Sequence, residues 1–225
     1  MKTISIIPAR GGSKGILLKN LVPLNGKPLL FYTTTASLNS KINRTIITTD
    51  NDDIAKYAKK IGAEVIIRPQ NLANDVIQIE PAMEHVLQQL EREGYIPDNV
   101  VLLQNTTPLR NSTHIDETLN MFKTKKLDSI FSGFLSHYLL WQLKNGRSVP
   151  INYDPLKRPN RQNMKTYVIE NGAIYLTKNK LFQKTKCRIS GKIGVYLMPE
   201  KLSIQIDQMS DIVVAEEIMN KYGKI

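Results

Sequence analysis

Apolar and polar positions alternate along the chain in short blocks that predict strands and helices in turn. Residues Thr3 to Ile7 form an apolar, β-branched run typical of a buried strand, and Arg44 to Thr49 and Ala63 to Ile67 repeat this pattern. Between these runs, Pro28 to Ser40 and Asp52 to Ile61 carry helical patterns. Such an order is typical of parallel strands joined by helical crossovers.

The ends and faces of these helices are also marked. The first helix is expected to bury Leu29, Leu30, Tyr32 and Leu38. In the second, Asp50 or Asn51 can cap the first turn, and Gly62 can close the last one.

The same order continues in the second half of the chain. Glu80 to Glu93 carries a helical apolar stripe, formed by Met83, Val86, Leu87 and Leu90. The expected elements that follow are a strand at Asn99 to Gln104, a helix at His114 to Lys123 and a strand at Ser129 to Phe134. We therefore predict an α/β fold with a Rossmann-like, doubly wound and mostly parallel sheet.

Residues 137–165 interrupt this periodicity. Tyr138 to Trp141 is apolar, Asn145-Gly146 predicts a turn, and three prolines exclude a long helix. Exposed aromatic and aliphatic side chains are typical of interface anchors, although a local lid would have the same composition. We expect one domain over residues 1–225, with this segment as an insertion.

Composition excludes several classes of function. The net charge is +11, yet the lysines are dispersed and no aromatic-interleaved basic stripe is present, so we expect no nucleic-acid partner. No apolar run approaches 20 residues, so we expect no membrane partner, and the single cysteine fits a cytoplasmic chain. The three histidines are scattered, which excludes a zinc site.

The loop after the first strand carries the chemistry. Three glycines, a serine and the cations Arg10, Lys14 and Lys19 follow Pro8 closely. Glycines let backbone N–H groups approach an anion, and the cations add positive charge, so the loop predicts a phosphate cradle. Its spacing fits neither common phosphate-loop motif, and a solvated surface turn is the alternative.

This opening, Ile-Pro-Ala-Arg-Gly-Gly-Ser-Lys-Gly followed by Lys-Asn, resembles the signature of the acylneuraminate cytidylyltransferases. The resemblance implies an enzyme that couples CTP to a nine-carbon 2-keto sugar acid and releases pyrophosphate. It also implies that residues 137–165 project from the core and help to form a homodimer. The nucleotide-binding residues implied are Arg10, Gly12, Ser13, Lys14, Asn20 and Asp75.

Asp75 lies in the segment Arg-Pro-Gln-Asn-Leu-Ala-Asn-Asp, which resembles the family's segment near the nucleotide base. It is equally suited to a place beside a helix N-cap.

Two further blocks resemble the family's sugar pocket. The first block is Leu-Leu-Gln, which ends at Gln104. After it, Asn105 and Thr107 replace the Pro and Ser that the family carries. Arg-Gln at Arg161 and Asn-Gly-Ala-Ile-Tyr match the other, and a guanidinium suits a sugar carboxylate. The sugar-binding residues implied are Gln104, Arg161, Tyr167, Asn171 and Tyr175.

The last block departs from the family. Ile-Gln-Ile-Asp stands where the family carries Asp-Ile-Asp, so Gln205 replaces one metal-binding carboxylate and Asp207 remains. We expect Mg²⁺, or Mn²⁺ in its place, at Asp207 with help from Asp211. The catalytic residues implied are Arg10, Lys19 and Asp207.

Three alternatives stay open at this point. One is a cytidylyltransferase for a different sugar acid, another is a nucleotide-binding homologue weakened by Gln205, and nucleic-acid binding comes third. The absence of an aromatic pair around Cys187 to Ile189 favours a di-acylated acid of the legionaminic or pseudaminic type over sialic acid.

Overall fold

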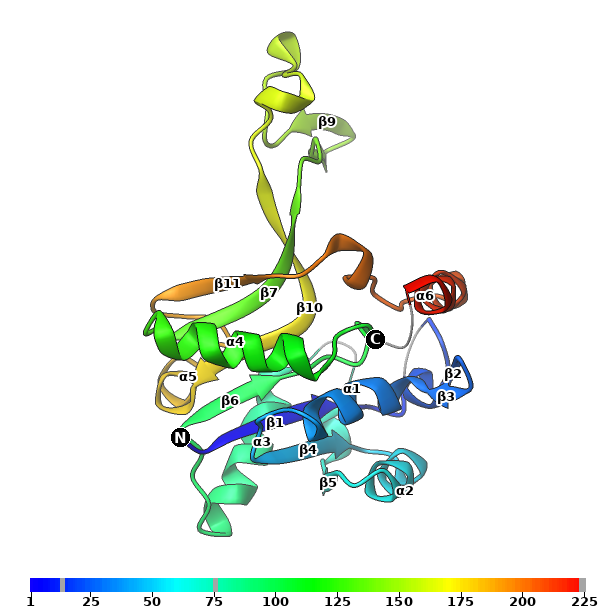
Figure 1. The fold of residues 1–225 in the computed structure, drawn as a ribbon, viewed down its shortest axis with the longest axis vertical. Helices are drawn as coiled ribbons and strands as arrows, with labels where there is room; N and C mark the ends of the chain where they lie inside the picture. The colour runs from blue at the N-terminus through cyan, green and yellow to red at the C-terminus, as the bar shows by residue number, and fades with distance from the viewer. Residues whose placement is uncertain (13–14, 75–76, 223–225) are drawn as a thin grey trace.

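A seven-stranded sheet forms the centre of the computed structural model, which describes residues 1–12, 15–74 and 77–222 (Figure 1). The strand order is β11-β7-β10-β6-β1-β4-β5, and β10 is antiparallel to both of its neighbours. The strands are β1 (Thr3–Pro8), β4 (Arg44–Thr49), β5 (Glu64–Ile67), β6 (Asn99–Leu102), β7 (Ser129–Ser136), β10 (Tyr167–Lys178) and β11 (Ile193–Leu197).

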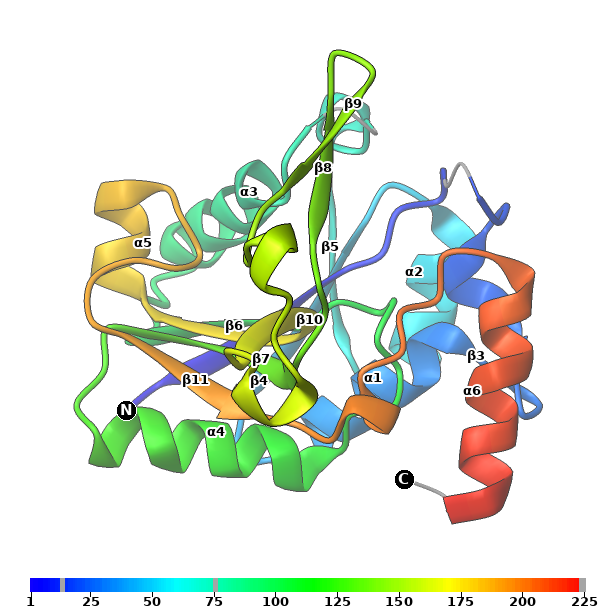
Figure 2. The same cartoon turned by 90° about the horizontal axis from the view of Figure 1, so that it is seen from above.

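Helices cover both faces of the sheet (Figures 1 and 2). One core cluster contains residues of α1 (Leu29–Leu38), α2 (Asp52–Lys60) and α4 (Ser112–Thr124). The opposite cluster contains residues of α3 (Glu80–Arg92) and α5 (Asn179–Thr185). A third cluster packs α6 (Met209–Tyr222) against β2 (Pro23–Leu24), the partner of β3 (Lys27–Pro28). The predicted fold class is confirmed.

The path of the chain makes the carboxyl end of β1 a topological switch point. The chain runs from β1 to β4 and β5 on one side, and then returns through α3 to β6 on the other side of β1. Ligands in doubly wound sheets bind where the strand order reverses in this way. The glycine-rich loop begins at this point.

The predicted strands and helices are present, most of them with bounds that differ by one or two residues. β4 has the predicted bounds, and Met83, Val86, Leu87 and Leu90 of α3 are buried as expected. The prediction for Leu38 is wrong, because α1 ends there and its side chain is 40% exposed. Helix α4 starts two residues early because Asn111 caps it by accepting from the N–H of His114.

Strand β10 was not predicted from the sequence. Its register against β7 shifts between Glu170 and Tyr175, and Gly172 there has a φ of 70°. Glycine adopts this conformation without steric cost, so the interruption that looks like a turn is an irregularity within one long strand.

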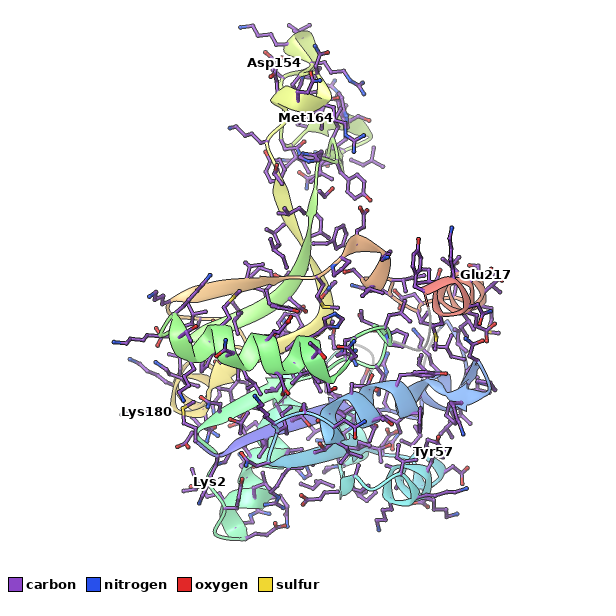
Figure 3. The ribbon with its side chains drawn as sticks, in the orientation of Figure 1. Lys2, Tyr57, Asp154, Met164, Lys180 and Glu217 are labelled. Carbon is purple, nitrogen blue, oxygen red and sulfur yellow. The ribbon has the colours of Figure 1, made fainter. Side chains whose placement is uncertain are left out.

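Residues 137–166 form an arm that leaves the body of the molecule from the ends of β7 and β10 (Figure 1). Figure 3 shows Asp154 and Met164 at its far end. A hairpin of β8 (Trp141–Lys144) and β9 (Arg147–Pro150) turns at Asn145-Gly146, where both residues have positive φ, which confirms the predicted turn. The 3₁₀ turns η3 (Pro155–Lys157) and η4 (Arg161–Asn163) follow.

Within the described ranges, every helix is too short or too polar to cross a membrane.

Candidate functional site

Two asparagines hold the loop that follows β1 in place through hydrogen bonds. Asn20, in the 3₁₀ turn η1 (Lys19–Leu21), donates from Nδ2 to the carbonyl of Arg10 at 2.9 Å. Asn105 in turn donates to Oδ1 of Asn20 at 2.9 Å. Asn20 is buried, so in this structure its amide fixes the loop, and its predicted donation to a nucleotide stays a prediction.

Asp50, at the end of β4, anchors the same loop from the other side. Its Oδ1 accepts from the N–H of Gly11 at 3.0 Å and lies 3.8 Å from Nη2 of Arg68. Both side chains of this pair are buried, 7% and 4% exposed. Burial lowers the pKa of Arg68, Asp50 opposes that shift, and the nearby charge of Arg10 adds to it.

A cavity of about 280 Å³ lies beside this pair. Arg10 and Arg68 line it, together with the segment from Leu72 to Asn74 and residues 77–79. From the sequence, Asp50 was expected as a possible helix cap, and neither Asp50 nor Arg68 was predicted to be a site residue. The signal for Asp50 was its position directly after a buried strand.

Lys19 and Asp207 meet across the site, although 188 residues separate them. Nζ of Lys19 donates to the carbonyl of Ile206 at 2.8 Å and lies 3.1 Å from Oδ1 of Asp207. The side chain of Lys19 is 12% exposed and that of Asp207 is 71% exposed. A Cβ on Gly15 would lie 2.3 Å from the carbonyl oxygen of Asp207, so this approach requires glycine.

The carboxylate of Asp211 is engaged in hydrogen bonds within the protein. Its Oδ2 accepts from the N–H groups of Asp207 and Gln208, at 2.8 and 2.9 Å, and so caps the start of α6. Partial burial acts to raise the pKa of Asp211, but these two donors hold it below its ordinary value. A direct role as a metal ligand would require Asp211 to give up these bonds.

Asp207 is the described side chain that suits a Mg²⁺ ion at this site. No group of three His, Cys, Asp or Glu side chains gathers within the described part of the chain. Asp207 offers one solvent-facing carboxylate next to the phosphate loop, and Gln205 is exposed beside it. One carboxylate, completed by phosphate oxygens and water, is a normal set for Mg²⁺, so the residues fit one nucleotide-bound ion.

Gln104 and the irregularity of β10 around Gly172 form another side of the candidate site. A Cβ on Gly172 would lie 2.3 Å from Oε1 of Gln104, so the two residues are in close contact. Thr107 donates from Oγ1 to the carbonyl of Asn171 at 2.6 Å. The amide of Asn171 is fully buried, accepting from Ser132 and donating to Ser203. Asn171 therefore positions this wall, and its predicted contact with a sugar hydroxyl stays a prediction.

Tyr175 lies on the neighbouring part of β10 in a charged setting. Its hydroxyl donates to Oε2 of Glu170 at 2.9 Å, and the guanidinium of Arg188 lies 5.3 Å from its ring. Arg188 is paired with Glu80 at 2.6 Å. Burial and then the bond to Glu170 raise the pKa of Tyr175, so its hydroxyl stays protonated. Glu80, Glu170 and Arg188 were not predicted as site residues.

The arm carries the remaining predicted residues. Arg161 is exposed in η4, near Met164 at the far end of the arm (Figure 3). Tyr167 stands where the arm joins the sheet, and its hydroxyl donates to the carbonyl of Asn152 at 3.4 Å. The structure therefore does not bring Arg161 together with Gln104 and Tyr175 within one chain. Ser13, Lys14 and Asp75 lie outside the described residues.

Comparisons with known proteins identify the family and support the fold. The family model described as cytidylyltransferase matches residues 4–221. An N-acylneuraminate cytidylyltransferase of Oncorhynchus mykiss is 34% identical over 97% of this chain and 50% of its own length. A pseudaminic acid cytidylyltransferase of Campylobacter jejuni is 28% identical, covering 96% of this chain and 95% of that protein.

The chain thus spans about half the length of the first curated relatives that it matches. Among solved structures, a CMP:2-keto-3-deoxy-manno-octonic acid synthetase complexed with CTP superposes with a TM-score of 0.73. It is 16% identical, and the match covers 99% of this chain and 100% of that one, so it supports the fold. On the family match over nearly its whole length, this chain belongs to the cytidylyltransferase family.

Proposed function

We propose that this chain transfers the cytidylyl group of CTP to a nine-carbon 2-keto sugar acid and releases pyrophosphate. The observation that carries the proposal is the pairing of Lys19 with Asp207 beside the glycine-rich loop. This pair puts a cation and a solvent-facing carboxylate, the predicted metal ligand, side by side near the switch point of the sheet, which supports the proposal. The relatives named for N-acylneuraminate and pseudaminic acid support the choice of sugar acid.

Arg10 and Lys19 would bind the triphosphate, together with the predicted donors Gly12, Ser13, Lys14 and Asn20. The cavity of about 280 Å³ beside Arg10 and Arg68 would receive the base, and the sequence predicts Asp75 as a further contact with the nucleotide. Asp50 would keep Gly11 and Arg68 in place for both parts of the nucleotide. Such binding brings the α-phosphorus to a fixed position, and that is most of what this reaction needs.

The 2-hydroxyl of the sugar would attack the α-phosphorus in line, so that an O–P bond forms as the bond to pyrophosphate breaks. Lys19 would neutralise charge that develops on the phosphates, and preorganised charges of this kind are usually worth about 10²–10³ in rate. Mg²⁺ or Mn²⁺ held by Asp207 would supply further polarisation of the α-phosphate and a lower pKa for the attacking hydroxyl.

The sugar would lie against Gln104, Tyr175 and the irregularity at Asn171. Its carboxylate is predicted to pair with Arg161, which stands on the arm and not at this wall. A second copy of the chain would solve this, if the arm of one subunit reached the site of the other. The arm exposes Leu143 at 81% and Trp141 at 46%, as expected for a surface that a partner covers.

Pyrophosphate release from CTP tests the proposal, with Mg²⁺ and with sialic, legionaminic, pseudaminic and deaminated acids in turn. We expect turnover with one of them, and the di-acylated acids are the first choice. CTP binding without turnover would favour the alternative of a homologue weakened by Gln205, and Gln205→Asp should then restore activity. No binding of CTP would refute the proposal.

Mixing two inactive variants tests the shared site. Lys19→Ala and Arg161→Ala homodimers should each be inactive, whereas a mixture contains heterodimers with one intact site. Because about half of the dimers in an equal mixture are heterodimers, recovery of about a quarter of the wild-type activity would support a site built from two subunits. No recovery from a mixture shown to exchange subunits would contradict it.

A further inference from the structure

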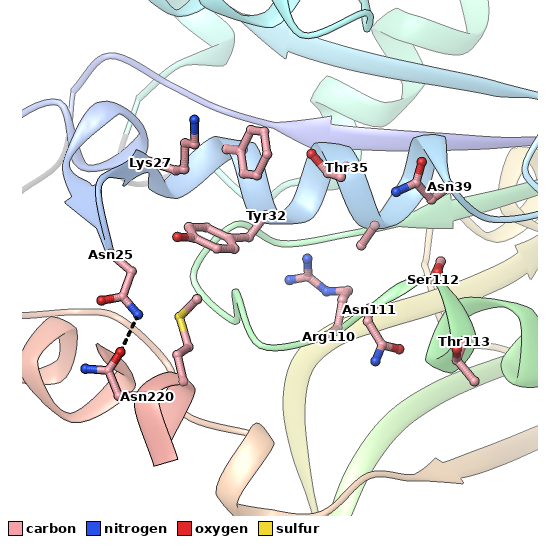
Figure 4. Close-up of a pocket in the computed structure, with 13 residues that line it drawn as sticks. Asn25, Lys27, Tyr32, Thr35, Asn39, Arg110, Asn111, Ser112, Thr113 and Asn220 are labelled. Atoms are coloured by element: carbon pink, nitrogen blue, oxygen red, sulfur yellow. Dashed lines mark hydrogen bonds between the residues drawn. The ribbon is translucent and has the colours of Figure 1, made fainter. Parts of the chain in front are cut away.

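A second, larger cavity lies on the α1 and α4 face of the sheet (Figure 4). It measures about 710 Å³ and lies between α1, the start of α4, the β2–β3 turn and the end of α6. None of the residues assigned above to the nucleotide or the sugar lines it. Its volume is within the range of ordinary small-molecule sites, roughly 300–1,000 Å³.

The lining chemistry points to an anion. Lys27 and Arg110 contribute two cations, and no carboxylate lines the cavity within the described ranges. Glu216 accepts from the N–H of the lining residue Asn25 at 2.8 Å. This carboxylate is thus used by a backbone N–H group at the edge of the cavity.

Arg110 is a buried cation without a counter-charge. Its side chain is among the largest that are fully buried, and none of the described carboxylates pairs with it. Its terminal nitrogens donate to Thr33 and to the carbonyls of Gln104 and Thr107, while Nε has no hydrogen-bond partner within the described residues. Burial lowers the pKa of Arg110 to about 9, so the group is still charged at neutral pH. A buried charge of this kind is costly unless an opposite charge compensates it.

The start of α4 faces the same space. Ser112 and Thr113 occupy its first turn and line the cavity, and Asn111 caps the helix at the N–H of His114. In Figure 4 the guanidinium of Arg110 lies among the lining residues, between Tyr32 of α1 and Asn111. The N-terminus of this 13-residue helix attracts negative charge, and the guanidinium of Arg110 does so too. The hydroxyl groups of Ser112 and Thr113 are further possible hydrogen-bond donors to an anion.

An aromatic surface lies opposite this anion position. Phe31 and Tyr32 meet edge to face at 5.6 Å between ring centroids, and the ammonium of Lys27 lies 5.6 Å from the ring of Phe31. Asn25, Asn39 and Asn220 add amide groups to the lining of the cavity. We propose that this cavity is a second ligand site that takes a phosphate monoester carrying a polar ring, either a nucleoside monophosphate or a sugar phosphate.

Arg110 connects this cavity to the functional site. The same guanidinium that borders the cavity holds the carbonyls of Gln104 and Thr107. Thr107 in turn holds the carbonyl of Asn171, and Gln104 abuts Gly172. An anion placed near Arg110 would compete with those carbonyls for its N–H groups. Occupancy of the cavity therefore changes how the chain presents Gln104.

Calorimetric titration tests the site directly, in protein carrying Arg10→Ala and Lys19→Ala so that the glycine-rich loop no longer binds anions. CMP, glucose 6-phosphate and inorganic phosphate are titrated separately, without CTP or a sugar acid. We expect 1:1 binding of one of the two esters, and the ester that binds identifies the source of the phosphate. Because no turnover is measured, the result is independent of the proposed cytidylyl transfer.

A matched pair of variants assigns the binding to the cavity. Ser112→Glu puts a carboxylate in the first turn of α4, where it suits the helix but repels an anion, and should weaken binding at least tenfold. Ser112→Gln has the same length without the charge and should change affinity by less than threefold. Lys27→Gln should weaken binding several-fold, which keeps the test valid if Ser112→Glu does not fold.

Several outcomes would overturn the proposal. These are no binding of either ester, equal affinity for Ser112→Glu and Ser112→Gln, or inorganic phosphate binding as tightly as the esters. Hydrogen exchange tests the connection separately: bound ester should alter exchange at residues 103–109 by at least severalfold. Unchanged exchange in ligand-saturated protein would refute the link through Arg110.

Discussion

Removing Asp50 should destabilise the protein and loosen the glycine-rich loop at the same time. Its carboxylate is the acceptor for Gly11 and the counter-charge of Arg68, with 7% and 4% of the two side chains exposed. Taking one partner from a buried ion pair costs about 3–5 kcal/mol. The separation of 3.8 Å is long for such a pair, which favours the lower end of that range.

The loss of the partly buried hydrogen bond to Gly11 adds about 1 kcal/mol. We therefore expect Asp50→Ala to lower the free energy of unfolding by about 4 kcal/mol, a large part of the roughly 5–15 kcal/mol typical of a domain. Asp50→Asn keeps an acceptor for Gly11 and loses only the charge, so about 3 kcal/mol is expected for it.

Urea denaturation of the two single variants, of Arg68→Met and of the double variant Asp50→Ala/Arg68→Met measures the coupling. Because the double variant leaves no unpaired charge, it should be more stable than the sum of the single changes implies, by at least 1 kcal/mol. In the transfer assay, Asp50→Asn should raise the KM for CTP about tenfold, which corresponds to about 1.4 kcal/mol of binding energy. Additive stabilities together with an unchanged KM for CTP would refute the reasoning.

Four further changes have defined outcomes. Gln205→Asp adds a carboxylate beside Asp207 and should tighten Mn²⁺ binding in the presence of CTP about tenfold by electron paramagnetic resonance; an unchanged affinity would contradict the single-carboxylate site. Gly172→Ala, at a φ of 70° and against Gln104, should cost about 1–3 kcal/mol and lower kcat/KM for the sugar acid while the KM for CTP stays the same. Leu143→Asp should shift sedimentation from dimer to monomer, whereas Lys144→Asp, a charge change next to it, serves as its control. Burial lowers the pKa of His114, so as the pH falls the unfolded chain takes up a proton on this side chain before the folded chain does. The free energy of unfolding should therefore lose nothing to His114 above about pH 6.5 and should decrease as the pH drops below that value. The pKa of His85 is lowered as well, so wild type has to be compared with His114→Gln to isolate the contribution of His114. The variant should lose less stability at low pH than wild type does.

The sequence was sufficient for the elements that depend on local patterns. The apolar run of β1, the stripe of α3 and the Asn145-Gly146 turn all follow from spacing and turn chemistry, and all are present. The parallel order of the first strands followed from their alternation with helices.

Other features depend on contacts between distant parts of the chain. Ser37 is buried in α1 because it shares hydrogen bonds with Ser5 and Thr45, so a polar residue takes the place that Leu38 was expected to fill. The pairing of Lys19 with Asp207 spans 188 residues, and no local pattern shows it. The same is true of Arg188 and Glu80, which stand beside Tyr175.

Strand β10 is both the stalk of the arm and one side of the proposed sugar site. Its pairing with β7 runs from Tyr167 at the arm to Thr177 in the sheet, and the irregularity at Gly172 lies between them. An exchange of arms between relatives that ends before Tyr167 would therefore transfer the proposed dimer contacts alone. An exchange that continues through Tyr175 would also carry substrate preference, so the position of one junction decides whether a chimera inherits a new partner or a new substrate.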